Sequence, residues 1–166
     1  MFIAHLPAGY LLTATLLTRL REVPIKSITV FGAGLIGAMA PDLDLIYFYF
    51  VDNCKTHHHK YLTHWPLLWF LLLVVGVLWW KISRKSKGAL LLMVGALNAF
   101  GHILLDSFVG DIWWFAPFLD KPFALFTVSS GLHPWWLNFI CHWSFAVELT
   151  ICIGAILLFL KRRNRI

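Results

Sequence analysis

Residues 89–109 read ALLLMVGALNAFGHILLDSFV, an apolar run that carries two ionisable side chains, His102 and Asp106. Its length matches the roughly 20 residues that a helix needs to cross about 30 Å of hydrocarbon. The whole chain has this character, since 60% of its 166 residues are hydrophobic and only 13% are charged. That composition excludes an ordinary soluble domain of this size and predicts a protein embedded in a lipid bilayer.

Four further apolar segments predict an all-α, polytopic bundle of about five membrane segments. They are Phe2 to Leu20, Ser27 to Asp52, Trp65 to Ile82 and Trp135 to Leu160. No linker, repeat or low-complexity tract divides the chain, so we expect a single domain over residues 1–166. The first segment has its positive charges after the apolar stretch, which is typical of a retained anchor rather than a cleaved signal.

The second of these segments is interrupted by Pro41 and Asp42. Because proline breaks a helix, we expect a crossing helix up to Ala40 and a short interfacial helix from Leu45 to Val51. The first half carries three glycines, at positions 32, 34 and 37. Small residues of this kind let membrane helices approach closely, so this segment is predicted to pack tightly against a neighbour.

Basic residues flank the apolar segments in three clusters. These are Arg19/Arg21/Lys26, Lys81/Arg84/Lys85/Lys87 and Lys161/Arg162/Arg163/Arg165. Placing all three in the cytoplasm makes the five segments alternate in direction, as the positive-inside rule requires. We therefore interpret the net charge of +6 as a topology signal and expect no nucleic-acid partner. The prediction is a multi-pass protein of the bacterial inner membrane with a cytoplasmic C-terminus.

In this topology the outer, periplasmic side receives residues 1–5, 41–64 and 110–134. The last stretch is rich in tryptophan and phenylalanine and is too apolar for a solvated loop. We expect it to lie in the membrane interface or to dip back as a re-entrant segment, where irregular backbone must be covered by protein or water. Most of the histidines and acids of the chain fall on this same side.

His102 and Asp106 are four residues apart on a predicted helix, so their side chains share one face and can hold one metal ion. An ionisable side chain inside a membrane helix is costly, which favours a functional role; a hydrogen-bonded pair that joins helices is the alternative. Asp42 and Asp44 follow the helix break. An N-cap role explains one of these two acids, and their mutual repulsion favours a cation between them.

The run from His57 to His64, HHHKYLTH, has the most unusual local composition in the chain. Three consecutive histidines cannot all face one ion, so we expect one or two of them to be exposed and His64 to be a separate candidate ligand. Tracts of this kind usually bind metal, although a polar loop that happens to be rich in histidine is the alternative.

His5 and His142 are candidates of a weaker kind, because a lone histidine near a helix start is as often an interfacial residue as a ligand. Glu148 lies six positions after His142, which on a continuous helix is about 120° around the axis. A buried glutamate needs a partner, and another helix can supply it.

Taken together, these motifs resemble the YdjM-like, LexA-regulated membrane-bound metal-dependent hydrolases. The resemblance rests on His5, Pro41-Asp42-x-Asp44, His59-Lys60-x-x-Thr63-His64 and His102-x-x-Leu105-Asp106. In this chain Lys60 stands where the family usually has arginine, and Trp65 where it usually has serine. More distantly, the pattern is similar to zinc-dependent phospholipases C and single-strand nucleases, whose HxxxD motif matches His102 and Asp106. Their HxxxE motif is not matched, because Ala146 follows His142 at that spacing.

The resemblance and the residues together imply a hydrolase that cleaves a phosphoester in a lipid or lipid-linked substrate at the periplasmic face. The expected metal ligands are His5, Asp42, Asp44, His59, His64, His102, Asp106 and His142. Asp42 or Asp44 doubles as general base, and Lys60 steadies the substrate phosphate as a point charge. The expected cofactor is a divalent metal, zinc first, with manganese or iron as alternatives. The number of ions and the oligomeric state stay open.

Two other functions fit the same residues. A metal transporter or a metal-binding sensor would hold the ion without hydrolysis, but the inner halves of the predicted helices carry almost no polar ligands for a transport path. A structural membrane protein would use the histidines and aspartates only to join helices, and it would bind no stoichiometric metal.

Overall fold

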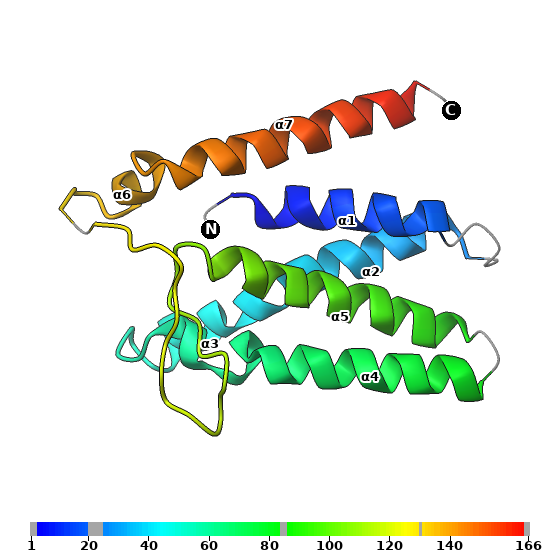
Figure 1. Ribbon diagram of the computed structural model, residues 1–166, viewed down its shortest axis with the longest axis horizontal. Helices are drawn as coiled ribbons and strands as arrows, with labels where there is room; N and C mark the ends of the chain where they lie inside the picture. Colours follow the sequence, from blue (N-terminus) through cyan, green and yellow to red (C-terminus); the bar gives the residue numbers. More distant parts are fainter. Residues whose placement is uncertain (1–2, 20–24, 84–85, 130, 165–166) are drawn as a thin grey trace.

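The computed structural model describes residues 3–19, 25–83, 86–129 and 131–164, which fold into helices joined by irregular connections. The helices are α1 His5–Arg19, α2 Ser27–Met39, η1 Pro41–Leu43, α3 Asp44–Phe50, η2 His58–Lys60, η3 Leu62–His64, α4 Pro66–Ile82, α5 Lys87–Asp106, α6 Trp136–Ile140 and α7 Ser144–Arg163. The five long helices run lengthwise, and the short helices and the long connection from α5 to α6 lie at one end (Figure 1). The predicted all-α architecture is confirmed.

Two of the described helices, α5 and α7, are long and apolar enough to cross a membrane. A third crossing results if α2 and the segment Pro41–Phe50, which are bent by 56° relative to each other, form one broken span. The break falls at the predicted proline. Helix α4 has 17 residues and α1 has 15, so both are shorter than a typical crossing helix. The described residues therefore contain two to three candidate spans by length and composition, and about five remains a prediction.

Helix α5 lies at the centre of the bundle, in contact with α1, α2 and α4. Glycines make these contacts close: a Cβ atom added at Gly37 of α2 would overlap the backbone of Gly95 on α5, and one at Gly34 would overlap Thr13 of α1. Gly32, in contrast, faces open space. The predicted tight packing of this segment is thus confirmed for two of its three glycines.

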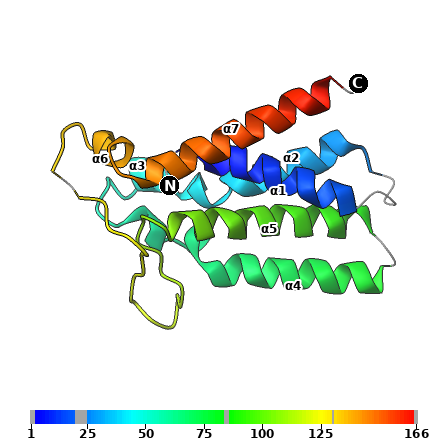
Figure 2. The same cartoon turned by 45° about the horizontal axis from the view of Figure 1, so that its top comes forward.

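Helix α7 lies at the edge of the bundle and packs mainly against α1, as Figures 1 and 2 both show. The sequence predicted one continuous helix from Trp135 to Leu160, and this is wrong: α6 ends at Ile140 and α7 begins at Ser144. In the break, Nδ1 of His142 lies 3.3 Å from the backbone nitrogen of Ser144, which donates to it, and 2.9 Å from the Ser144 hydroxyl oxygen. This side chain thereby satisfies one of the amides that the start of a helix leaves unpaired.

The connection from α5 to α6 lies at the end of the bundle, not between its long helices (Figures 1 and 2). Ile112 and Phe123 exchange two backbone hydrogen bonds of 3.0 and 2.9 Å, which close a loop. Within this loop Phe115 is 67% exposed and Phe118 is 85% exposed. The expected placement in the membrane interface is consistent with these apolar side chains and stays a prediction.

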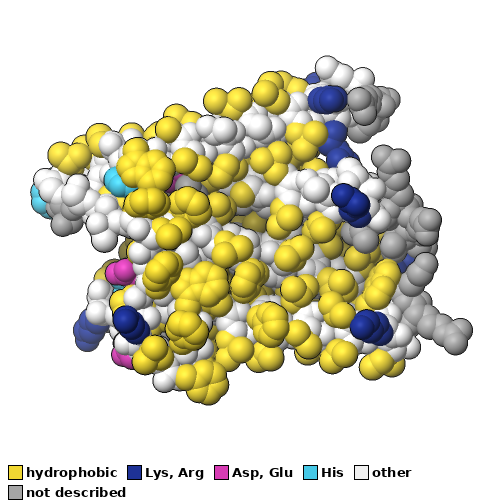
Figure 3. Space-filling model, in the orientation of Figure 1, with side chains coloured by type: hydrophobic (Ala, Val, Ile, Leu, Met, Phe, Trp, Pro, Cys, Tyr) yellow, Lys and Arg dark blue, Asp and Glu magenta, His cyan; other side chains and the backbone are white. Residues whose placement is uncertain are grey.

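Apolar side chains cover the visible face along the helices, and the Lys and Arg side chains lie near the two ends of that apolar band (Figure 3). One end carries Arg19 in the last turn of α1, Lys81 in the last turn of α4, and the basic residues 161–163 in the last turn of α7. The described members of the predicted basic clusters thus share one end of the bundle, opposite the short helices, whereas Arg21, Arg84, Lys85 and Arg165 lie outside the described residues.

Candidate metal centre

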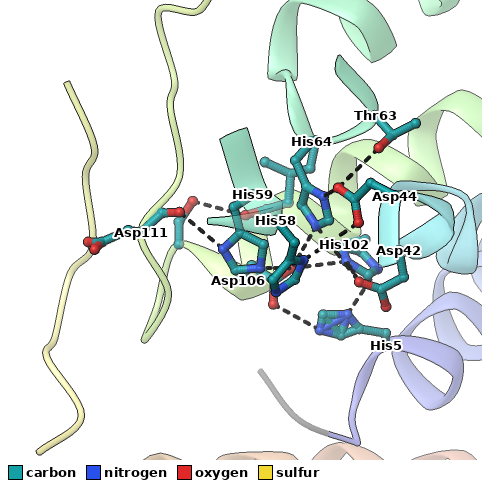
Figure 4. Close-up of polar contacts among 12 residues, drawn as sticks. His5, Asp42, Asp44, His58, His59, Thr63, His64, His102, Asp106 and Asp111 are labelled. Carbon is teal, nitrogen blue, oxygen red and sulfur yellow. Dashed lines mark hydrogen bonds and ion pairs between the residues drawn. The ribbon is translucent and has the colours of Figure 1, made fainter. Parts of the chain in front are cut away.

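The end of the bundle that holds the short helices also holds a cluster of histidines and aspartates, shown in Figure 4. Its members come from six elements far apart in the sequence. They are His5 of α1, Asp42 of η1, Asp44 of α3, His58 and His59 of η2, His64 of η3, and His102 and Asp106 of α5. Several overlapping groups of these side chains place one ligand atom each within 4.8 Å of one another, so the cluster can hold a metal ion.

Three of the buried histidines are oriented through their Nδ1 atoms. Nδ1 of His59 lies 3.0 Å from the backbone oxygen of Asp111, and Nδ1 of His102 lies 2.7 Å from that of Ala38. Nδ1 of His64 contacts a carboxylate oxygen of Asp44. A carbonyl or carboxylate oxygen only accepts, so each Nδ1 donates and each neutral ring keeps its lone pair on Nε2. Metal-binding histidines in proteins are commonly oriented in this way.

The three Nε2 atoms converge on one oxygen, Oδ2 of Asp106. They lie 2.9 Å from it in His102, 3.7 Å in His64 and 3.9 Å in His59. Ligand atoms about 2.1 Å from a tetrahedral zinc ion are separated by about 3.4 Å. His64, His102 and Asp106 therefore have the spacing of ligands that could share one ion, and His59 lies beside them. Among the described residues, Nε2 of His64 and Nε2 of His102 are buried without a hydrogen-bond partner of good geometry, which also fits a cation.

The electrostatics of the loop histidines agree with this assignment. Burial holds the pKa of His59 well below its usual value, and the charge of Asp106 opposes this only in part, so the ring is in its neutral, metal-binding form. Burial also lowers the pKa of His64, but hydrogen bonds to Asp106 and Asp44 outweigh it and raise that pKa above normal. The carboxylates thus stabilise positive charge at the centre of the cluster, where a metal cation would supply it.

His5 and Asp42 complete the cluster on the side away from His59. Nε2 of His5 lies 3.1 Å from Oδ1 of Asp106, whereas the other three histidines lie nearest to Oδ2. Oδ1 of Asp42 lies 3.5 Å from Nε2 of His102 and 3.8 Å from Nε2 of His64. The Asp42 side chain is 40% exposed whereas that of Asp106 is 3% exposed, so Asp42 lies between the buried centre and the cavity beside it.

Asp44 lies behind His64 instead of beside it. One of its oxygens contacts Nδ1 of His64 and accepts a 3.1 Å hydrogen bond from the Thr63 hydroxyl. The other lies 3.5 Å from Nδ1 of His58. Its position is that of a residue that orients histidines, whereas the sequence suggested a ligand. The alternation Asp-x-Asp at the helix break does not distinguish these two roles.

Two predicted site residues lie elsewhere. Nζ of Lys60 forms a 2.7 Å ion pair with Asp120 on the surface of the connection from α5 to α6. His142 bonds Ser144 in the break before α7 and belongs to none of the groups that can hold a metal among the described residues. All the other predicted ligands lie in the cluster, with Asp44 behind His64.

Two residues of the site were not singled out from the sequence. His58 contributes an imidazole to one of the metal-binding groups, and its only signal was membership of the histidine run. A Cβ atom added at Gly110 would lie 2.9 Å from Cε1 of His59 and 3.1 Å from the backbone oxygen of Asp106. A glycine at this position therefore lets the His59 ring approach the end of α5, and its place four residues after Asp106 was the available signal.

A comparison with protein-family models matches the chain over residues 1–165 to the YdjM inner membrane protein family. No curated protein and no solved structure matches the chain significantly.

Proposed function

Since the chain belongs to the YdjM inner membrane protein family, we propose that it is a membrane-bound hydrolase that uses a divalent metal to cleave a phosphoester bond. The observation that carries this proposal is the convergence of three oriented imidazoles on one buried carboxylate, Asp106. Zinc suits a site with several imidazoles and few carboxylates, and manganese or iron are the alternatives.

The residues divide into ligands and groups that act on water or substrate. His64, His102 and Asp106 form the most buried of the metal-binding groups, and we assign them as ligands, with His59 and His5 beside them. A divalent ion held there would make water acidic enough to ionise near pH 7 and would polarise a phosphoryl oxygen. Asp42 is the partly exposed carboxylate of the cluster, which places it to accept a proton from attacking water at the cavity wall.

The cavity beside the cluster supports a phosphoester with an apolar portion. It has a volume of about 560 Å³, which is in the range of small-molecule sites. Its lining includes the polar side chains Asp42, His59 and Asp106 and the apolar side chains Phe48, Phe126, Val128, Trp135 and Phe139. A charged headgroup against the polar side chains and an alkyl chain against the apolar ones would match this composition.

The surroundings of the cavity favour a substrate that stays in the membrane. Phe50 at the end of α3 is 83% exposed, and Phe118 on the outer loop is 85% exposed. Aromatic and apolar side chains exposed at one end of an apolar bundle are typical of a membrane interface. A lipid or lipid-linked phosphoester reaches such a site with its tails still in the bilayer.

The proposed orientation follows from the opposite end of the bundle, where the basic residues of α1, α4 and α7 lie. If that end is cytoplasmic, as the positive-inside rule favours, the metal cluster faces the periplasm and the C-terminus faces the cytoplasm. Reporter fusions after Arg163, and labelling of a single cysteine placed in the 115–120 loop, would test this topology.

The test of the function is an assay of the purified full-length protein with phospholipids and isoprenyl phosphates, with and without a chelator. We expect phosphate or phosphoalcohol release that the chelator abolishes and added zinc or manganese restores. His102→Ala should lose the activity, whereas His133→Ala, which changes an exposed histidine of the same outer region, should keep it. Activity that resists the chelator, or that survives in His102→Ala, would refute the metal-dependent mechanism.

A metal transporter or sensor is the alternative. Transport requires ligands that continue across the membrane, and below His102 the described part of the bundle offers the pair Asn98 and Thr13, whose side chains bond each other at 3.2 Å. An amide and a hydroxyl are weak ligands for a transition metal. Stoichiometric metal in a protein without hydrolytic activity on any of these substrates would favour the alternative.

A further inference from the structure

Glu148 is an almost completely buried carboxylate on α7, a long helix of which few residues are buried. Its side chain is almost inaccessible, because Glu148 is 1% exposed. In contrast, only 17% of the residues in the apolar 18-residue stretch of α7 are buried. The buried residues of α7 are Ser144, Glu148 and Ala155. An ionisable side chain inside a membrane helix is costly and needs partners that repay the cost.

The partners of this carboxylate are at the start of α1. Oε2 of Glu148 accepts a 2.6 Å hydrogen bond from the backbone N–H of Ile3 and a 3.2 Å hydrogen bond from that of Ala4. Ala4 is fully buried, and its carbonyl oxygen accepts from Ala8 in the first turn of α1. A carboxylate at this place satisfies amides that a helix start leaves unpaired and interacts favourably with the positive end of the helix dipole.

The residue that follows this anchor is His5. Its Nε2 lies 3.1 Å from Oδ1 of Asp106, and its Nδ1 lies 2.9 Å from Nδ1 of His102. Both of these contacts are to side chains of the cluster. His5 directly follows Ala4 in the chain, so the position of its ring depends on where the start of α1 is held.

We propose that Glu148 is a positioning residue of the metal centre: through the amides of Ile3 and Ala4 it fixes the start of α1 and so holds His5 against Asp106. This inference rests on the proposed metal site. It gives α7, which contributes no member of the cluster, a defined part in the site, because its one buried carboxylate sets the place of a histidine on another helix.

The test measures the zinc affinity of the purified full-length protein by competition with a chromophoric chelator. Glu148→Ala should weaken zinc binding about 10-fold to 100-fold, the usual effect of removing a group that orients a ligand. Glu148→Gln keeps an oxygen acceptor of the same length and should retain most of the affinity, whereas Glu148→Asp, which is one methylene shorter, should not. Thr150→Val, an exposed change on the same helix, is the control and should bind zinc normally.

A double-mutant cycle separates this role from general support of the fold. If Glu148 acts through His5, Glu148→Ala should cause no further loss of zinc affinity in a protein that already carries His5→Ala. Additive losses, or unchanged affinity in both Glu148→Ala and Glu148→Asp, would overturn the proposal. If Glu148→Ala does not fold, the comparison of Glu148→Gln with Glu148→Asp decides.

A second measurement does not depend on metal. In a protein with Cys54, Cys141 and Cys152 changed to serine, the single variant Ala4→Cys should react slowly with a maleimide while Glu148 is present and faster after Glu148→Ala. Equal labelling rates would show that Glu148 does not hold the start of α1. Slow labelling in a protein that binds no zinc would support the contact between Glu148 and the start of α1 but refute the proposed metal-dependent function.

Discussion

Helices α5 and α7 are equal in length and similar in apolar character, yet they occupy different environments. Each has 20 residues and is long and apolar enough to cross a membrane. In the apolar 18-residue stretch of each helix, 44% of the residues of α5 are buried in the protein, compared with 17% for α7. Helix α5 contributes His102 and Asp106 to the histidine and aspartate cluster, whereas α7 contributes no member of it and buries one carboxylate, Glu148.

The difference shows that apolarity does not decide which membrane helix becomes central, because lipid tails are as apolar as a protein interior. What distinguishes α5 is its content of small and polar residues on the buried face, among them Ala96, Asn98 and Ala99. These let neighbouring helices approach and bond to it. Four substitutions test this contrast, from the largest expected effect to the smallest.

Asp106→Asn should have the largest effect. The change keeps the shape of the side chain but removes the charge on which His5, His64 and His102 converge, so zinc affinity and any hydrolytic activity should fall by more than about 100-fold. Zinc titration and the lipid phosphoester assay measure the two losses. The control is Asp120→Asn, an exposed carboxylate of the outer loop, and an Asp106→Asn protein that still binds zinc normally would contradict the assignment.

Gly37→Ala should destabilise the bundle by about 1–3 kcal/mol, because the added methyl group overlaps the backbone of Gly95 on α5 and the helices must separate. The matched change on α7 is Gly154→Ala, where the new Cβ atom would lie 3.8 Å from the side chain of Leu11, an ordinary van der Waals contact. Thermal or denaturant unfolding in detergent compares the two. Equal stabilities would mean that α5 and α7 are packed alike in solution.

Asn98→Leu removes a buried amide that donates to Thr13 on α1 and to the backbone of Val94. Side-chain hydrogen bonds between membrane helices contribute about 0.6 kcal/mol on average and at most about 1.7 kcal/mol, so a loss in this range is expected in the same unfolding experiment. Thr150→Val on α7, whose hydroxyl bonds its own helix at Ala146, should leave stability unchanged. A similar loss of stability in Asn98→Leu and Thr150→Val would contradict the proposed difference between α5 and α7.

His142→Ala should have the smallest effect. The imidazole bonds Ser144 at the start of α7, so its removal should cost about 0.5 kcal/mol of stability, the low end for a partly exposed hydrogen bond. Zinc affinity should be unchanged. A clear drop in affinity would instead restore His142 to the metal ligands.

Much of this arrangement could be predicted from the sequence because the strongest signals are local. Pro41 marks the bend after α2, and the spacing of His102 and Asp106 places both on one helix face. The histidine run and the acids also meet, since the topology sends their loops to the same end. These predictions need only chain direction and helix periodicity.

What could not be predicted depends on contacts between distant segments. The break between α6 and α7, at residues 141–143, contains neither proline nor glycine. The bond between His142 and Ser144 that accompanies it depends on how these two side chains are oriented, which the sequence does not specify. The position of Asp44 behind His64, and that of Glu148 against Ala4, join residues 20 and 144 positions apart. Spacing along one helix carries no information about either.

The orientation of the imidazoles has a consequence for the order of assembly. His59 and His102 are held by backbone oxygens of Asp111 and Ala38, which are fixed by the fold and do not require an ion. A site whose donors are aligned by the polypeptide avoids much of the ordering cost when its ligand arrives. If the cluster binds metal as proposed, insertion into the membrane and closure of the helices can be completed first, and the metal can be acquired afterwards. Maturation of the protein would then respond to the metal supply of that compartment rather than to conditions at the ribosome.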